Sequence, residues 1–237
     1  MLYCFTPEVM IATFIIEIVL AMYVFIRRRT TFFGRLSAAL LTLLGIFQFA
    51  EYRICMGADS VVWAKIGIIA TSLLPIIGLH LILGVGEKTR VMKWLYAAGG
   101  AMVLYIIISP VAVTGAVCGG NYVIFHSQSL FYWFYSVYYF SFLFGGMWLA
   151  YRLAIRLREN NPNKKEALYW MIIGYLSFIL PMAIVLALYD YTLVGVTSIM
   201  CGFAVIFALI LAARVVPLYH RENNPSLPVG RQKENHR

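Results

Sequence analysis

The sequence predicts an all-α membrane protein, a single bundle of seven transmembrane helices with its N-terminus outside and its C-terminus in the cytoplasm. Three observations lead to this prediction. Hydrophobic residues make up 62% of the 237 positions, and the mean hydropathy is +0.82. Charged residues make up only 12%, about half the share found in a soluble domain. Seven apolar runs nearly fill the chain, and the basic residues cluster in alternate connections between them.

Each apolar run is long enough to cross a hydrocarbon core of about 30 Å. We expect helices, because lipid offers no partner to an unpaired backbone N–H or C=O group. The first run is retained as a helix and is not a cleaved leader, because its basic cluster Arg27–Arg29 follows the apolar residues instead of preceding them. Residues 1–218 would form the bundle and 219–237 a polar, disordered cytoplasmic tail. The seven predicted spans are 8–26, 33–52, 62–85, 92–114, 129–153, 166–188 and 193–216.

The basic residues predict the orientation. Of the 19 lysines and arginines, 17 follow the first, third, fifth and seventh runs, and the positive-inside rule makes that side cytoplasmic. The same asymmetry explains the formal charge of +9 through topology and contact with anionic membrane lipids, so no nucleic acid partner is needed. We therefore expect a multi-pass protein of the cell membrane.

Three of the four cysteines lie on the predicted outer side, where a disulfide is permitted. These are Cys4, Cys55 and Cys118, and they allow three pairings. Cys55 with Cys118 is the favoured pair, since it would join the turn after the second run to the long loop before the fifth. The alternative is that all three are unpaired small apolar residues at helix ends. Cys201 lies inside the seventh run and is expected to be a packing residue.

A polar group interrupts the outer ends of the second and third runs. Gln48 and Glu51 are three residues apart and share one helix face. Lys65 and Asp190 are expected at the same level, and Glu51 is expected to pair with Lys65 or Arg53. Three interpretations remain open: an ion pair that fixes helix packing, a ligand vestibule, or charges that reach the membrane interface.

Two ionisable residues lie deeper in the predicted spans. Glu17 is near the middle of the first run, where a lone carboxylate is either protonated or paired, and it is the candidate for a proton-relay or cation site. His80 is expected to be a hydrogen-bonded structural residue. With only four histidines and no HxxxH or HExxH pattern, the sequence predicts no metal site, no cofactor and no catalytic constellation.

Prolines interrupt three runs, at Pro75, Pro110 and Pro181. Each removes one backbone donor and frees an upstream carbonyl, which bends a helix. Thr71 lies one turn before Pro75, and Ser177 one turn before Pro181, so their hydroxyls can satisfy the freed groups in a tolerated kink. The alternative is that Pro75 and Pro181 are hinges.

The fifth run begins with an aromatic segment in which Tyr132, Tyr135 and Tyr139 share a helix face. Tryptophan and tyrosine gather at membrane interfaces without any ligand, so a simple aromatic belt is one explanation. Tyr139 lies deeper than a belt requires. The alternative is therefore a stacking wall for an organic or lipidic ligand.

Several short motifs support two resemblances. Cys4-Phe5-Thr6, the basic turn at Arg27–Arg29, the FQFAEY segment that ends the second run and Pro75 resemble features of uncharacterised bacterial multi-spanning proteins. Those proteins begin Met-Cys-Phe-Ser and carry a glutamine followed by a glutamate in their second helix. This chain departs from them by inserting Leu2 and Tyr3 and by having Thr6 in place of serine.

Trp63 at the start of the third run, Pro75 within it and the short preceding turn are also similar to the seven-helix sensor region of some bacterial histidine kinases. That resemblance implies detection of an external or membrane-borne ligand. Because no kinase sequence follows Arg237, the signal would pass to a separate cytoplasmic partner.

Together these patterns predict a seven-helix sensor or ligand-binding protein with an outward-facing pocket for a small or lipidic ligand. The alternatives are a small secondary transporter, proton-coupled through Glu17, and an intramembrane lipid-modifying enzyme. No lysine lies in the seventh run, so a rhodopsin-type retinal linkage is excluded there. The predicted binding residues are Gln48, Glu51, Lys65, Tyr135, Tyr139, Asp190 and Thr197.

Overall fold

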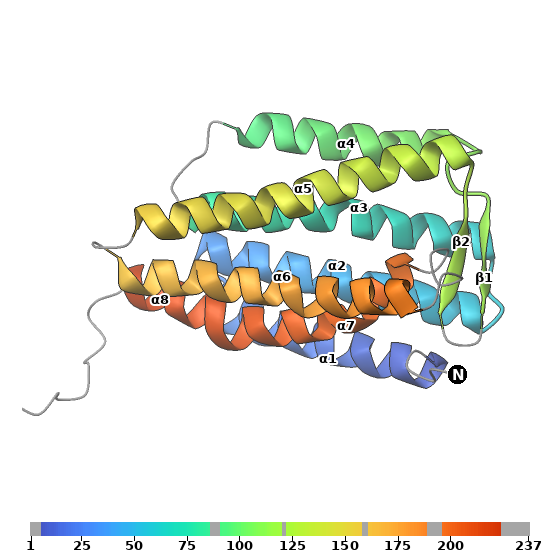
Figure 1. Ribbon diagram of the computed structural model, residues 1–237. Helices are drawn as coiled ribbons and strands as arrows, with labels where there is room; N and C mark the ends of the chain where they lie inside the picture. The colour runs from blue at the N-terminus through green and yellow to red at the C-terminus, as the bar shows by residue number, and fades with distance from the viewer. Residues whose placement is uncertain (1–5, 86–90, 120–121, 158–160, 189–195, 224–237) are drawn as a thin grey trace, which may run out of the picture.

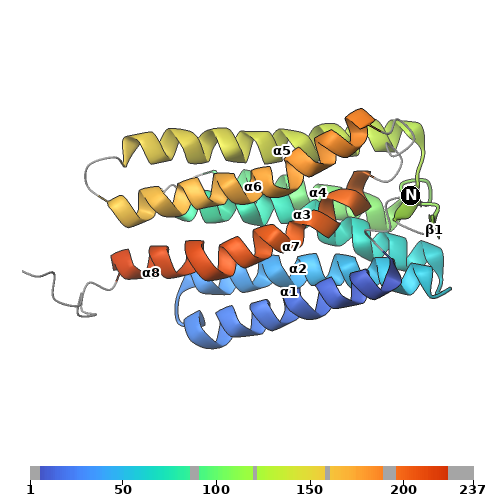
Figure 2. The same ribbon diagram turned by 60° about the horizontal axis from the view of Figure 1, so that its bottom comes forward.

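The computed structural model describes residues 6–85, 91–119, 122–157, 161–188 and 196–223. Over these ranges the chain is nearly all helical, and long helices run back and forth alongside one another (Figure 1). A two-stranded hairpin lies at the end where α1 begins, and α8 lies at the opposite end (Figures 1 and 2). The elements are α1 (Pro7–Arg28), α2 (Phe32–Cys55), α3 (Ser60–Val85), α4 (Met92–Ile108), β1 (Gly115–Cys118), β2 (Val123–His126), α5 (Ser129–Arg156), α6 (Pro162–Leu188), α7 (Val196–Ile210), the π-helical turn η2 (Leu211–Val215) and α8 (Val216–Asn223).

Helices α1 and α2 form a closely packed antiparallel pair. The rings of Phe14 and Phe49 lie 5.0 Å apart, and a Cβ on Gly45 would come within 2.9 Å of Ile18. These contacts fix the register of the two helices. The residues that α1 buries recur every three or four positions along one stripe, and they are Met10, Thr13, Glu17, Ala21 and Val24.

Helix α3 is the most enclosed of the long apolar helices, and more than half of its residues are buried. Asp59 caps its first turn, since its Oδ1 accepts hydrogen bonds from the backbone N–H groups of Val61 at 3.0 Å and Val62 at 3.1 Å. Further along, α3 approaches α6 at Gly78, where an added Cβ would collide with the Tyr175 hydroxyl. The absence of a side chain at Gly78 therefore leaves room for the tip of the Tyr175 side chain.

The fourth predicted span, 92–114, extends too far. Helix α4 ends at Ile108, and Ser109 has an extended conformation with ψ of 121°. A residue that precedes proline is driven out of the helical region, and Pro110 follows directly. The apolar residues after Pro110 therefore leave the helix.

Farther along this connection, β1 and β2 form a hairpin that the sequence did not predict. Strands β1 and β2 are antiparallel, with Gly115 opposite His126 and Cys118 opposite Val123. Gly115 has φ of 153°, a value that side-chain-bearing residues rarely adopt. A disulfide between Cys55 and Cys118 joins the end of α2 to β1, and it is the pairing that the sequence favoured.

The last apolar helix changes its winding before it ends. In η2 the N–H of Val216 donates to the carbonyl of Leu211, five residues earlier. Pro217 follows within the same continuous helix, where its missing N–H group leaves one upstream carbonyl without a backbone donor. Helix α8 continues to Asn223, five residues beyond the predicted boundary at 218; the rest of the predicted tail lies outside the described residues.

Five helices in the described parts of the chain are long and apolar enough to cross a membrane: α1, α2, α3, α6 and the continuous stretch Val196–Arg221. Helix α4 is apolar but has 17 residues, and the 28-residue α5 is not among the five. Much of the outer surface is apolar, and on a soluble monomer it would form unusually large patches. These features fit a helical membrane bundle. Among the most exposed apolar residues are Ile26, Trp94, Ile108, Leu130 and Trp133.

Candidate functional site

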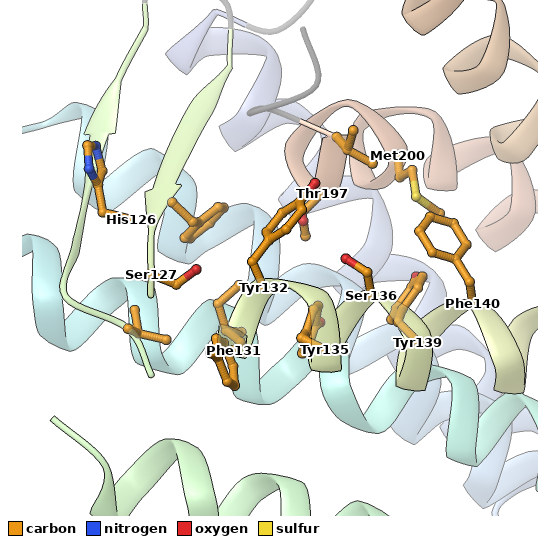
Figure 3. A pocket seen from close by; sticks show the side chains of 14 residues that line it. His126, Ser127, Phe131, Tyr132, Tyr135, Ser136, Tyr139, Phe140, Thr197 and Met200 are labelled. Atoms are coloured by element: carbon orange, nitrogen blue, oxygen red, sulfur yellow. The ribbon is translucent and has the colours of Figure 1, made fainter. Parts of the chain in front are cut away.

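A pocket near the hairpin end lies between α3, α5, β2 and the start of α7 (Figure 3). The empty space within it is about 730 Å³ when the solvent-open mouth is counted, of which about 60 Å³ can hold the centre of a water molecule. We call it the aromatic pocket. Its lining consists of Ile68, Val113, Phe125, His126, Ser127, Phe131, Tyr132, Tyr135, Ser136, Tyr139, Phe140, Val196, Thr197 and Met200.

One wall of the aromatic pocket is a row of rings on α5. Phe131, Tyr135 and Tyr139 are spaced four residues apart, so they project from the same helix face. The ring centroids are 5.7 Å apart for Phe131 and Tyr135 and 6.1 Å apart for Tyr135 and Tyr139. Trp133, by contrast, is 70% exposed on the outside of the helix. Tyr135 and Tyr139 thus line the pocket, whereas Trp133 faces outward as an interface residue would.

Hydrogen bonds attach this wall to α3 just before Pro75. The hydroxyls of Thr71 and Tyr135 are 2.7 Å apart, and the Tyr138 hydroxyl donates to the Ser72 carbonyl at 2.8 Å. Pro75 has no N–H group, so this turn of α3 lacks a backbone donor. The Ser72 hydroxyl does not replace the donor that is missing at Pro75, because it donates to the carbonyl of Ile68, farther upstream. Tyr138 of α5 therefore donates to the carbonyl next to that of Thr71, the carbonyl that Pro75 leaves without its usual backbone donor.

The opposite wall is the first turn of α7. Thr197 and Met200 line the pocket, and Tyr132 of α5 points toward Thr197 across it (Figure 3). Ser136 lies between the tyrosines and adds a second hydroxyl. The pocket is therefore largely apolar with a few hydroxyl groups, and its described lining contains no lysine, arginine, aspartate or glutamate.

A second cavity continues deeper into the bundle, between α2, α3, α5, α6 and α7. It encloses about 400 Å³, and Pro75 and Cys201 lie on its surface. Tyr139 and Met200 line both cavities, so the two meet at these side chains. The candidate hinge Pro75 is thus buried and lies at the edge of this cavity. Pro181 is half-buried in α6, where the Ser177 hydroxyl donates to the carbonyl of Gly174 at 2.7 Å.

The predicted polar residues Gln48 and Glu51 lie elsewhere, in a buried group between α1, α2 and α7 that we call the carboxyl cluster. It consists of Glu17, Gln48, Glu51 and Ser198, which are at most 2% exposed. Glu17 and Glu51 interact electrostatically, and the Ser198 hydroxyl faces the Glu51 carboxyl as a hydrogen-bond donor. The Ser198 oxygen also accepts from the backbone N–H of Val123 in β2 at 3.2 Å.

The ion pair that we expected at Glu51 is not formed by the described residues. The Arg53 guanidinium lies over the Trp63 ring, 5.4 Å from its centroid, and Lys65 donates to the Ile107 carbonyl at 3.4 Å. Arg53 is two positions from Glu51 and so projects from a different side of α2. Lys65 lies on the side of α3 that faces α4. Neither base is available to the buried carboxyl.

The structure therefore divides the predicted site into two. Tyr135, Tyr139 and Thr197 meet in the aromatic pocket, whereas Gln48 and Glu51 join Glu17 in the carboxyl cluster. Lys65 belongs to neither group, and Asp190 lies outside the described residues. His80 is hydrogen-bonded, with its Nδ1 at 2.6 Å from the Tyr96 hydroxyl.

Sequence reasoning missed two contributors, the β2 segment with Phe125, His126 and Ser127, and Ser198. Pro110 and the glycines around Cys118 were the available signal for a hairpin. Ser198 gave no signal, since a single serine in an apolar helix is common. No group of three or more His, Cys, Asp or Glu side chains that could hold a metal ion occurs among the residues described.

Comparison of the chain with models of known protein families, with curated proteins and with solved structures finds no match.

Proposed function

We propose that this chain is a seven-span protein of the cell membrane that binds a small, uncharged and largely apolar ligand in the aromatic pocket and acts as a sensor. The carrying observation is the pocket itself, with a tyrosine wall on α5, the Thr197 hydroxyl opposite and few polar groups between them. Aromatic walls with a few placed hydroxyls are typical of sites for organic ligands. A hydroxylated aromatic compound or a lipid with a neutral head group fits this chemistry.

The orientation proposed from the sequence agrees with the position of the pocket. With the N-terminus outside, the hairpin end and the mouth of the pocket would face the exterior, where a disulfide is stable. The signal would leave through the basic end near α8, by a bend at Pro75 or Pro181, and would reach a separate cytoplasmic partner. The sensor-like resemblance of the third run supports this direction of signalling.

A blocking substitution tests the pocket. Ser136 lies on the pocket lining of α5, so Ser136→Trp would fill the cavity, whereas Val137→Trp places the same side chain on the exposed side of the same helix, where Val137 is 59% exposed. Binding of 1-naphthol and of dodecanol would be measured as a shift in melting temperature of the purified protein. We expect the wild type and Val137→Trp to be stabilised and Ser136→Trp not to be.

Equal responses of the two variants, at equal melting temperatures without probe, would remove the aromatic pocket as the binding site. Thr197→Val provides a finer test, because it keeps the shape and removes one hydroxyl. It should weaken 1-naphthol binding about 5- to 10-fold, the loss expected for one hydrogen bond of about 1 kcal/mol.

A small secondary transporter is the second candidate, favoured by the fully buried Glu17 in the middle of α1. Buried carboxyls in membrane helices frequently mark ion or proton pathways. Uptake into proteoliposomes under a pH gradient distinguishes the two functions. Transport that depends on the gradient and is lost in Glu17→Gln would favour the transporter; a binding protein shows no gradient-driven accumulation.

A further inference from the structure

Four buried polar atoms of the carboxyl cluster have no hydrogen-bond partner among the described residues: Glu17 Oε1, Glu17 Oε2, Gln48 Nε2 and Glu51 Oε1. Unsatisfied buried polar atoms are rare, and each costs about 1–3 kcal/mol or more when charged. Here they come from two helices and lie within one group. Such a concentration indicates that an occupant completes the site.

The occupant must be positively charged, because the cluster has two acids and no base. The nearby basic groups are committed elsewhere, Arg53 to the Trp63 ring and Lys65 to the Ile107 carbonyl. The titratable groups that face Glu17 from the neighbouring described helices are Glu51 on α2 and the Cys201 thiol on α7. Neither supplies a positive charge.

The oxygen atoms of the carboxyl cluster suit a small cation that prefers oxygen ligands. Two carboxyl groups, the Gln48 amide and the Ser198 hydroxyl offer at most about six oxygens, and amide rotation presents either the oxygen or the nitrogen of Gln48. The Ser198 oxygen already accepts from Val123. Ca²⁺ takes six to eight oxygens and Mg²⁺ keeps several waters. The carboxyl cluster borders neither the aromatic pocket nor the deeper cavity, so the described residues leave little room for a hydrated divalent ion.

We propose that Glu17, Gln48, Glu51 and Ser198 bind one sodium ion, without its water shell, between α1, α2 and α7. Binding replaces one proton: a carboxylic O–H bond breaks, the proton leaves to water, and the carboxylate oxygens coordinate the ion. The second carboxyl keeps its proton. One sodium ion and one proton then balance the two carboxylates, and no electron is transferred.

The site is connected to the hairpin and to the aromatic pocket through α7. Ser198 faces the carboxyls, while its neighbour Thr197 lines the pocket on another side of the helix. Ser198 also holds β2 through Val123, three residues before His126 at the pocket edge. Sodium binding therefore fixes the turn of α7 that forms one pocket wall. The sodium site itself stands independently of what the pocket binds.

Thermal unfolding of the purified protein tests the sodium site. At constant ionic strength, replacing choline chloride by sodium chloride should raise the melting temperature with a saturating dose response. At a sodium concentration about a hundredfold above its Kd, the rise should be about 5–10 °C. Potassium and calcium should have much smaller effects. An equal effect of all salts, or a larger one of calcium than of sodium, overturns the proposal.

Isosteric variants assign the effect to the cluster. Glu17→Gln and Glu51→Gln should each abolish the sodium-dependent rise while folding normally in choline, since an amide fills the same space without the charge. Glu8→Gln is the matched control, because Glu8 is the exposed acid at the start of the same helix. A sodium response that survives in both cluster variants overturns the assignment.

Direct binding provides a second measurement that does not depend on unfolding. Radioactive ²²Na⁺ should bind the wild type with a stoichiometry of about one, and its apparent affinity should fall about tenfold per pH unit in the acidic range where sodium competes with the displaced proton. Absence of saturable ²²Na⁺ binding, with stability that responds to pH alone, shows a proton site and contradicts the proposal. Failure of the probes 1-naphthol and dodecanol to bind would leave these outcomes unchanged.

Discussion

At Gly78, an added methyl group would disturb the contact between α3 and the Tyr175 side chain of α6. A Cβ at this position would collide with the Tyr175 hydroxyl of α6, and Tyr175 is buried. Gly84, two turns later on α3, has no heavy atom within 4 Å of the corresponding position. The two glycines therefore offer a matched pair in a single helix.

We predict that Gly78→Ala lowers stability by about 1–3 kcal/mol, the usual cost of overpacking, while Gly84→Ala is neutral or stabilises by up to about 1 kcal/mol. Tyr175→Phe removes the colliding oxygen and should restore most of the loss in the double variant. Melting temperatures in one detergent would check this. Equal losses in the two alanine variants, or no restoration by Tyr175→Phe, would show that the α3–α6 contact is different.

The Thr71–Tyr135 hydrogen bond joins the pocket wall to α3. Tyr135→Phe should lower stability by about 1 kcal/mol, because it removes one buried hydrogen bond and little volume. Tyr132→Phe is the control, since Tyr132 is 42% exposed and should change stability little. In a double-mutant cycle with Thr71→Val, the two losses should not add. Additive losses would mean that the hydroxyls do not interact.

The sequence predicted which side chains share a helix face better than it predicted which neighbouring helix those side chains contact. The three-residue spacing of Gln48 and Glu51 correctly placed them on one face of α2, and the four-residue spacing of the tyrosines correctly placed them on one face of α5. Lys65 was assigned to Glu51 because both lie near the same end of the bundle. Which neighbour a side chain faces depends on helix rotation, and the apolar surroundings of α3 give no periodic signal for it.

Among the elements, the hairpin between α4 and α5 has the strongest constraint, since the Cys55–Cys118 disulfide ties it to α2 across 63 positions. We predict that Cys55→Ser with Cys118→Ser lowers stability by about 2–4 kcal/mol. A reducing agent should lower the melting temperature of the wild type to the value of the double variant and leave that variant unaffected. A reductant effect that persists in the double variant would contradict this bond.

The hairpin also shows why element boundaries were partly missed. Val111, Ala112 and Val113 extend the hydropathy of the fourth run, so a sliding window continues through Pro110 to residue 114. Hydropathy measures transfer into an apolar environment and is the same for a helix and a buried strand. The separation of β1 from α4 depends on Pro110 and on the left-handed backbone at Gly115, which only local rules detect.

For the molecule as a whole, the number and direction of the crossings can be tested with reporter fusions. We predict that alkaline phosphatase is active when fused after residue 128, at the hairpin end, and inactive when fused after residue 161, between α5 and α6. Green fluorescent protein fused after residue 237 should be fluorescent, because it folds in the cytoplasm. The reverse pattern would invert the orientation, and equal activity of the two phosphatase fusions would contradict a crossing by α5.

Overall hydropathy, which is an average over the whole chain, was enough to predict a nearly all-helical fold. Overall hydropathy and the lengths of the runs predicted a helical bundle; each of the seven predicted spans contains a helix in the described chain, and five of the helices are long and apolar enough to cross a membrane. The average does not say which helix lies at the centre of the bundle. Helix α3 does so in the structure, and at Gly78 the missing side chain makes room for the Tyr175 hydroxyl. Small residues weaken the hydrophobic periodicity of a helix sequence, although they allow side chains of a neighbouring helix to pack closely against it.

The disulfide also makes the hairpin end mechanically uneven. On one rim of the aromatic pocket, β1 and β2 are anchored to α2 by a covalent bond, and Val123 is held by Ser198. On the opposite rim, the start of α7 meets Tyr132 of α5 without a covalent link among the described residues. Of the two rims, the hairpin rim is therefore the one held by a covalent bond among the described residues, and Ser198 joins the hairpin to the first turn of α7 through a hydrogen bond alone.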